Sequence, residues 1–250
     1  MLIIREEQMN LFERTALDRY KRGLVPHIRE HFPKHAGYLG DDGLIEVIEP
    51  GIARAGEYGF ESQRDLCLFV DLTIMLGAGF DTDPLLPWAA GVLHDLEIQE
   101  PRDRMEVLWE STMNYLDEVV GPGGVFPVNA YRTAGWVYLD EIGGAAGGFD
   151  VRTRDLLNEI WPEKYDHAGP AAIDSLISGV TATAQGFGVT GARGMAEFAI
   201  LAFLLGHRFH EDPVYPWVPE ILNDEETPDP DERMARLRKV FGGHLEKALQ

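Results

Sequence analysis

The segment YGFESQRDLCLFVDLTIMLGAGFDTDPLLPWAAGVLHD, residues 58–95, has a second version in this chain, FGVTGARGMAEFAILAFLLGHRFHEDPVYPWVPEILND, residues 187–224. The two segments align without a gap at an offset of 129 residues. Thirteen of the 37 positions from Gly59 to Asp95 are identical, whereas typical composition would give about two by chance. The sequence therefore predicts two copies of one structural unit.

The domain organisation follows from this repeat. Weaker similarity continues outward at the same offset, where Phe32-Pro33 aligns with Trp161-Pro162. A period of this length is too long for a short solenoid repeat. We predict two tandem homologous domains, residues 1–121 and 130–250, joined by a glycine- and proline-rich linker at residues 122–129.

The spacing of apolar residues is mostly three and four, which is typical of helices and not of strands. We therefore predict an all-α fold made of two helical bundles. Ser62 and Asp65 form a capping-box pattern at one helix start, and Pro50 predicts a kink or a later start in the helix that contains it. The predicted helices are 4–32, 41–57, 62–77, 87–95, 102–120, 151–160, 170–186, 191–206, 216–223 and 230–248.

The second copy departs from the first in one segment, Ile142 to Gly148, which contains four glycines. A glycine costs roughly 1 kcal/mol in a helix interior. The long first helix of copy one is therefore expected to be broken or remodelled in copy two.

The net charge of the chain is −20, from 42 acidic and 22 basic residues. This balance argues against a nucleic acid partner, which needs a basic surface, and against an anionic membrane surface. An acidic exterior suits either simple solubility or a basic protein partner reached by electrostatic steering. The N-terminal residues lack a signal-peptide pattern, so a cytoplasmic location is expected; the single cysteine, Cys67, has apolar neighbours and is expected to be a buried small hydrophobe.

One dipeptide suggests catalysis. His94-Asp95 at the end of an apolar helix resembles the metal-binding pair of the HD phosphohydrolases, in which histidines and aspartates hold a metal that activates water. The aligned pair in the second copy is Asn223-Asp224, so only the aspartate is shared. A histidine favoured by the helix dipole explains the pattern equally well, and the metal-dependent hydrolase is kept as an alternative.

A second histidine cluster occurs in copy two only. His207 and His210 are three residues apart, and Glu211 or Asp212 could complete a zinc set with them. Histidines at a helix end beside acidic loop residues are also common without a metal. No cofactor and no metal ligand is predicted, and the chain has no nucleophile motif, phosphate-binding loop or dinucleotide motif.

Residues identical in both copies are stronger evidence than these dipeptides. They describe a rigid turn closed by prolines and aromatic rings, which serves as a structural corner or as an edge that faces a partner. Arg64 and Arg193 are also shared, and they are predicted to pair with the turn aspartates. The predicted partner-binding residues are Phe80, Asp83, Trp88, Phe209, Asp212 and Trp217.

The opening Ile4 to Met9, the His31-Phe-Pro33 turn, the start of the helix at Arg64-Asp65 and the turn from Phe80 to Trp88 resemble a poorly characterised family of small bacterial α-helical proteins. Members of that family are often encoded near type VI secretion spike and effector genes. The resemblance supplies no catalytic residues and implies a protein-handling role. We therefore expect a non-enzymatic protein-binding module: an adaptor, an effector chaperone or an immunity-type partner.

Overall fold

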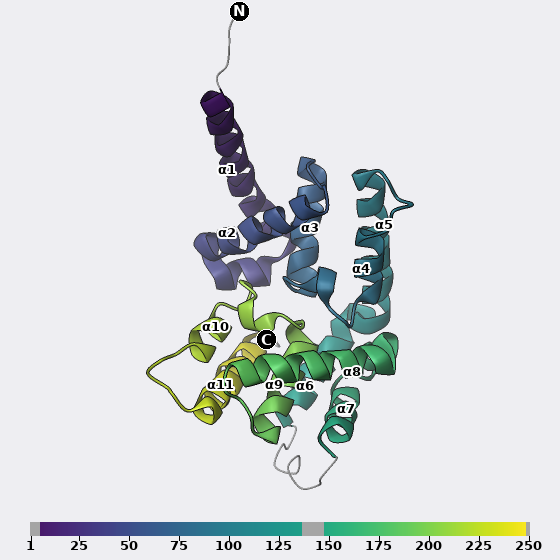
Figure 1. Ribbon diagram of the computed structural model, residues 1–250, viewed down its shortest axis with the longest axis vertical. Helices are drawn as coiled ribbons and strands as arrows, with labels where there is room; N and C mark the ends of the chain where they lie inside the picture. The colour runs from purple at the N-terminus through teal and green to yellow at the C-terminus, as the bar shows by residue number, and fades with distance from the viewer. Residues whose placement is uncertain (1–5, 137–147, 249–250) are drawn as a thin grey trace, which may run out of the picture. The chain divides into compact units, whose positions relative to one another are not determined.

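The computed structural model describes residues 6–136 and 148–248. These residues form helices, turns and loops without a strand, which confirms the all-α prediction. Figure 1 labels the α-helices along the chain. The helices, with η marking 3₁₀ helices, are α1 (Glu6–His31), α2 (Pro33–Glu57), α3 (Gln63–Leu76), η1 (Phe80–Thr82), α4 (Pro87–Leu93), α5 (Pro101–Val120), η2 (Pro122–Gly124), α6 (Val125–Trp136), α7 (Phe149–Ile160), α8 (Pro162–Gly186), α9 (Ala192–Leu205), η3 (Phe209–Glu211), α10 (Trp217–Leu222) and α11 (Pro230–Ala248).

The sequence repeat is also a repeat of secondary structure. The bounds of α2, α3 and η1 match those of α8, α9 and η3 at the sequence offset. Each copy also has glycines with positive φ at matching positions: Gly59 and Gly188 both have φ 79°. The backbone therefore has the same conformation just before the central helix of each copy, α3 or α9.

Two compact units make up the chain, Met1–Met75 and Leu76–Gln250. Unit 1 contains α1, α2 and nearly all of α3, and unit 2 contains the remaining elements, including α4 and α5 from the first sequence copy. The predicted domain limits, 1–121 and 130–250, are not tested by this division and stay a prediction. None of the helices in the described ranges combines the length and apolar character that a bilayer crossing needs.

The predicted helices 41–57 and 170–186 correspond to the second parts of α2 and α8, and each is preceded by a short helical segment that the sequence did not predict. α2 begins at Pro33 and α8 at Pro162, since proline at the first helical position loses no hydrogen bond. Each helix is interrupted by a glycine in the left-handed region, Gly40 with φ 66° and Gly169 with φ 76°. The break in α2 therefore lies at Gly40 and not at Pro50, where the sequence predicts a kink.

The predicted linker, residues 122–129, is helical: it comprises η2 and the first turn of α6. Gly121 ends α5 with φ 68°, and a Cβ atom there would lie 2.5 Å from the ring of Phe126. The glycine thus permits close packing of a ring against a turn. The expected helix break at 142–148 lies outside the described residues except for Gly148, which precedes α7.

In unit 1, α1 packs on α2, and α2 approaches α3 closely at a glycine. A Cβ atom on Gly51 would lie 3.2 Å from a methyl group of Val70. The predicted capping role of Ser62 at the start of α3 is confirmed, because the Asp65 amide donates to Ser62 Oγ at 3.1 Å. The Ser62 hydroxyl donates to the Asp65 carboxylate at 2.7 Å, where a full capping box has the Ser62 amide as donor.

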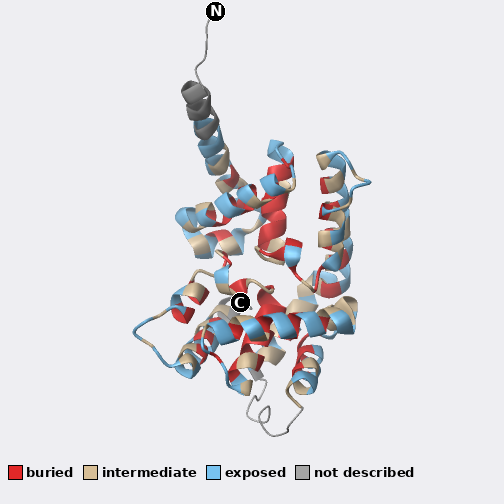
Figure 2. Ribbon diagram, in the orientation of Figure 1, coloured by how far each residue is buried: buried red, intermediate tan, exposed pale blue. Residues whose placement is uncertain are grey.

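Unit 2 is organised around α9, in which every residue from Ala196 to Leu205 is buried (Figure 2). Helix α8 packs on α9 and also on α5. The indole N–H of Trp161 donates to the carbonyl oxygen of Val119 at 2.9 Å, and the ring of His167 lies 4.9 Å from that of Tyr115. These contacts join the last helix of copy one to the second copy inside unit 2.

Candidate functional site

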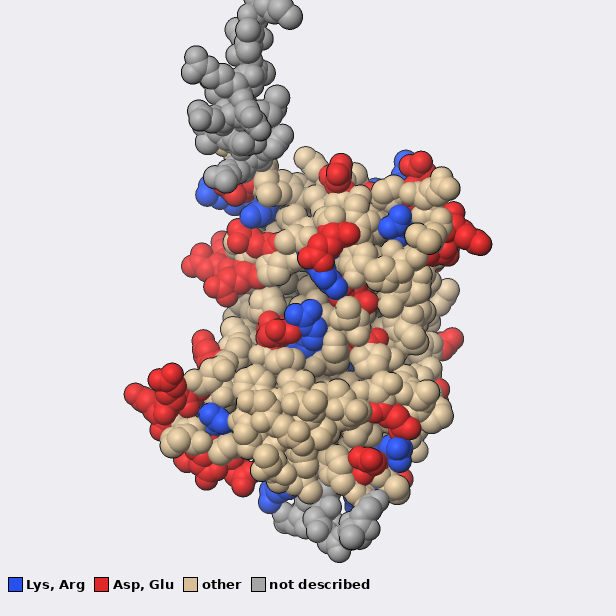
Figure 3. Space-filling view, viewed as in Figure 1, with Lys and Arg blue, Asp and Glu red and all other residues tan. Residues whose placement is uncertain are grey.

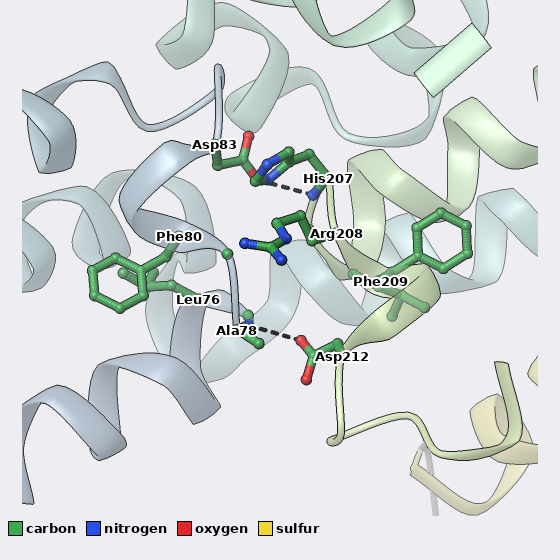
Figure 4. Close-up of a pocket in the computed structure, with 12 residues that line it drawn as sticks. Leu76, Ala78, Phe80, Asp83, His207, Arg208, Phe209 and Asp212 are labelled. Atoms are coloured by element: carbon green, nitrogen blue, oxygen red, sulfur yellow. Dashed lines mark hydrogen bonds and ion pairs between the residues drawn. The ribbon is translucent and has the colours of Figure 1, made fainter. Parts of the chain in front are cut away.

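The turns shared by the two copies meet inside unit 2. Each turn follows a glycine with positive φ, Gly77 at 98° and Gly206 at 104°. A Cβ atom on Gly77 would lie 3.1 Å from the carbonyl oxygen of Leu205, so the two turns touch through their backbones. Figure 4 shows this contact, with the rings of Phe80 and Phe209 pointing to opposite sides of it.

Asp83 connects the two turns. Its Oδ1 accepts a hydrogen bond from the amide of Leu85 at 2.8 Å, which closes an Asx turn within its own copy. Its Oδ2 accepts a hydrogen bond from the amide of His207 in the other copy at 3.1 Å. One carboxylate therefore fixes its own turn and binds the opposite one.

Asp212 makes the equivalent bonds in the reverse direction. Its Oδ1 accepts from the amide of Val214 at 2.8 Å, and its Oδ2 accepts from the amide of Ala78 at 2.8 Å. The four donor positions correspond at the offset of the sequence repeat. We call this reciprocal pair of aspartates, Asp83 and Asp212 with the amides they bind, the aspartate clasp.

The clasp is not symmetric in its electrostatics. Burial acts to raise the pKa of Asp83, but the hydrogen bond and charge of His207, the charge of Lys164 and a backbone amide together hold that pKa below its ordinary value. Burial raises the pKa of Asp212 to about 6, and its two amide bonds and the charge of Arg208 only partly oppose the rise. The two carboxylates accept equivalent hydrogen bonds, but the protein favours the ionised form of Asp83 and disfavours the ionised form of Asp212.

The difference arises at positions where the copies are not identical. Gly79 aligns with Arg208, and a Cβ atom on Gly79 would lie 2.6 Å from Arg208 Cδ. Ala78 aligns with His207, whose Nδ1 lies 3.5 Å from Asp83 Oδ2. The small residues of copy one thus make room for the large basic residues of copy two.

The pocket at this contact spans about 140 Å³ of space that includes open solvent, and essentially none of it is wide enough for a water molecule, whereas small-molecule sites begin at roughly 300 Å³. Its carboxylate oxygens accept hydrogen bonds from backbone amides of the same protein. The arrangement is therefore suited to holding two turns together.

Four of the six predicted partner-binding residues are deeply buried: Phe80, Asp83, Phe209 and Asp212. Trp217 is 9% exposed and stacks on His244 at 5.3 Å. Trp88 is half-buried, lies 5.7 Å from the Tyr115 ring, and has a buried indole N–H with no acceptor in the described part of the chain. A direct contact of these residues with a partner stays a prediction.

The predicted pairing of Arg193 with Asp212 is wrong, because within unit 2 Arg193 pairs with Glu197 at 3.3 Å. Arg64 pairs with Asp65 inside unit 1 at 3.2 Å, and its predicted pairing with Asp83 of unit 2 stays a prediction. The turn aspartates, Asp83 and Asp212, instead bind backbone amides at distant positions, which residue spacing does not reveal.

The His94-Asp95 pair lies at the C-terminal end of α4, where His94 is exposed. Asp95 accepts a hydrogen bond from the amide two residues later at 2.8 Å, and the aligned Asp224 accepts the same bond at 3.0 Å. The shared aspartate therefore has a turn-forming role in both copies. Within the described ranges, neither His94 nor Asp95 belongs to a group of three close potential metal ligands.

His207 and His210 have different surroundings. His207 lies beside Asp83 in the clasp, whereas His210 lies among the rings of Phe187, Phe198 and Phe209 at centroid distances of about 6 Å. Neither forms part of a group of three close ligand atoms among the residues that the structure describes.

One lysine and one group of polar residues were not predicted. Lys164 in α8 donates to the carbonyl oxygen of Phe203 at 2.6 Å, and burial lowers its pKa to about 8. The group, His27 with Cys67 and Asp71, lies in unit 1. The sequence does hold a signal for this group, because each of its three residues aligns with an apolar residue of copy two.

Comparisons with protein-family models, curated proteins and solved structures found no match to this chain. The resemblance to a family encoded near secretion genes therefore stays a prediction.

Proposed function

We propose that this chain is a non-catalytic protein-binding module of the cytoplasm, made of two homologous helical domains, that binds a basic client. An adaptor, an effector chaperone or an immunity-type partner of a secretion-system or toxin protein fits this role. The observation that carries the proposal is the structural role of the polar residues that both copies share. The aspartates that both copies retain bind backbone amides of their own fold.

The exterior supports a basic client. The loop between α10 and α11 lies in the segment Glu220 to Glu232, which contains seven acidic residues and no basic one. We call this segment the acidic loop. Figure 3 shows acidic side chains gathered where this loop leaves unit 2. Such a surface steers a basic protein toward the loop.

The acids of the loop divide into two kinds. Asp224 pairs with Arg236 and accepts a hydrogen bond from the amide of Glu226. Asp229 caps α11 through the amide of Asp231 at 3.0 Å. The side chains of Glu220, Glu225 and Glu226, in contrast, are exposed. Neutralising these three glutamates should therefore remove charge without breaking the fold.

The test is a pull-down with the tagged full chain at low and high salt, followed by quantitative binding of the captured protein. Changing Glu220, Glu225 and Glu226 to glutamine should weaken binding about tenfold, because three exposed ion pairs contribute about 0.5 kcal/mol each. The matched control removes three exposed acids elsewhere: Glu97, Glu100 and Glu110, each changed to glutamine.

A stoichiometric basic partner that is released by salt, and that binds the loop variant more weakly than the control variant, would support the proposal. Equal weakening by both variants would contradict a specific role for the acidic loop. The absence of any stoichiometric partner would contradict a stable complex.

A further inference from the structure

Two helices of unit 1 each present a pair of metal-ligating residues spaced by four, a spacing that places both on one helix face. Helix α1 carries His27 and His31, and helix α3 carries Cys67 and Asp71. His27 Nε2 lies 3.0 Å from both carboxylate oxygens of Asp71. The ligand atoms of His27, Cys67 and Asp71 all lie within 4.8 Å of one another.

The second copy has apolar residues at the same four positions, and all of them are buried. The aligned residues are Leu156, Ile160, Ala196 and Ile200. At these positions the aligned helices of copy two, α7 and α9, therefore carry only apolar side chains. The polar set in unit 1 is an addition specific to copy one, and it brings a nearly buried aspartate into the helix contact at a desolvation cost.

We propose that His27, Cys67 and Asp71 form a zinc site between α1 and α3. Imidazole nitrogen, thiolate sulfur and carboxylate oxygen are the three ligand types that zinc takes in proteins. Zinc bonds of about 2.0 to 2.3 Å in a tetrahedron place ligand atoms about 3.3 to 3.8 Å apart. Side-chain rotations that move the ligand atoms by about 1 Å therefore suffice to form the site. A fourth ligand is needed to complete the tetrahedron, and His31, whose ring centroid lies 4.4 Å from that of His27, is one further donor nearby.

The thiol provides a clear signature. Burial, together with the charge of Asp71, raises the pKa of Cys67 to about 11, so the metal-free protein holds a protonated thiol at neutral pH. Metal binding forms a metal–sulfur bond and releases the thiol proton to solvent. Because Cys67 is the single cysteine of the chain, any thiolate-to-metal absorption band belongs to this site.

The experiment titrates the metal-stripped full chain at neutral pH with Co²⁺, followed by competition with Zn²⁺. We expect one ion per chain, an ultraviolet thiolate-to-cobalt charge-transfer band, tetrahedral visible bands, and loss of all three on zinc addition. His27→Leu and the double variant Cys67→Ala with Asp71→Ile introduce the residues of copy two. Each should weaken binding on the order of 100-fold or more.

His94→Ala serves as the matched control, since this exposed histidine lies outside the group. Circular dichroism verifies that each variant is folded. No charge-transfer band from the wild-type chain at micromolar Co²⁺ would overturn the proposal. Unchanged affinity in folded His27→Leu would overturn it as well, because His27 and Asp71 would then form an ordinary ion pair. The site is independent of the proposed protein-binding role.

Discussion

Replacing Asp83 or Asp212 by asparagine should affect unit 2 unequally, although the two residues make equivalent hydrogen bonds. Asparagine keeps one acceptor of each carboxylate but turns an amino group toward a backbone N–H. The loss of one buried hydrogen bond costs about 1 to 3 kcal/mol in either variant. The removal of charge then adds a second effect of opposite sign at the two positions.

At Asp212, the rise of the pKa from 3.8 to about 6 corresponds to a cost of about 3 kcal/mol that the ionised form bears at neutral pH. Asparagine does not bear that cost, so Asp212→Asn should lie within about 1 kcal/mol of the wild type at pH 7.5. The pKa of Asp83 is lowered, so its ionised form is favoured. Asp83→Asn should therefore destabilise unit 2 by about 3 kcal/mol.

The dependence on pH separates this account from simple loss of contacts. Because the folded state binds the Asp212 proton more tightly than the unfolded state, the associated stability is fully present below pH 3.8 and is lost as the pH rises through about 6. Asp212→Asn should lack this fall. The lowered pKa of Asp83 places the corresponding loss below pH 3.8, outside that window.

Tryptophan fluorescence during urea unfolding measures these effects in unit 2 alone, since all five tryptophans follow residue 75. The free energy of unfolding is compared for the wild type and both variants from pH 4 to pH 8. An unchanged pH dependence in Asp212→Asn would refute the reasoning. Equal destabilisation by both variants at pH 7.5 would refute it too.

Five further substitutions test local features. Gly77→Ala should destabilise unit 2 by more than about 1 kcal/mol because of its positive φ and a nearby carbonyl oxygen. Gly91→Ala, in open space within α4, should instead stabilise unit 2 by up to about 1 kcal/mol. Thermal unfolding of the two variants measures the difference. Ser62→Ala should cost about 1 kcal/mol by removing the helix cap, seen as faster amide exchange at the start of α3. Asp95→Ala should cost about 1 kcal/mol through its lost turn bond, while His94→Ala should change stability by less than about 0.5 kcal/mol; a loss of bound metal in His94→Ala would instead favour the hydrolase alternative.

Much of the local structure was predictable. The helix positions, the capping role of Ser62 and the equivalence of the two turns follow from apolar spacing, short-range hydrogen bonding and the repeat itself. The short helical segments that begin at Pro33 and Pro162 were not predicted. The predicted helices 41–57 and 170–186 correspond to the segments that follow the non-helical glycines at 40 and 169.

The candidate site was predicted only in part. The sequence identified Asp83 and Asp212 as shared and left open whether their turns form a structural corner or an edge that faces a partner, but it suggested arginine partners. The structure places both aspartates in the interior, where they bind amides of the opposite copy. Sequence spacing does not specify such partners, because they depend on how the two turns approach each other.

The sequence alone thus determined the duplication, the helical class and the acidic charge, because periodicity, composition and local backbone preference are properties of short segments. The tertiary structure decided which groups meet. The His207 and Ala78 amides lie 124 and 134 residues from the aspartates that bind them, and His27 lies 44 residues from Asp71. Burial and neighbouring charge arise only after such distant segments pack, so the unequal aspartates and the histidine–cysteine–aspartate group become visible only in the folded chain.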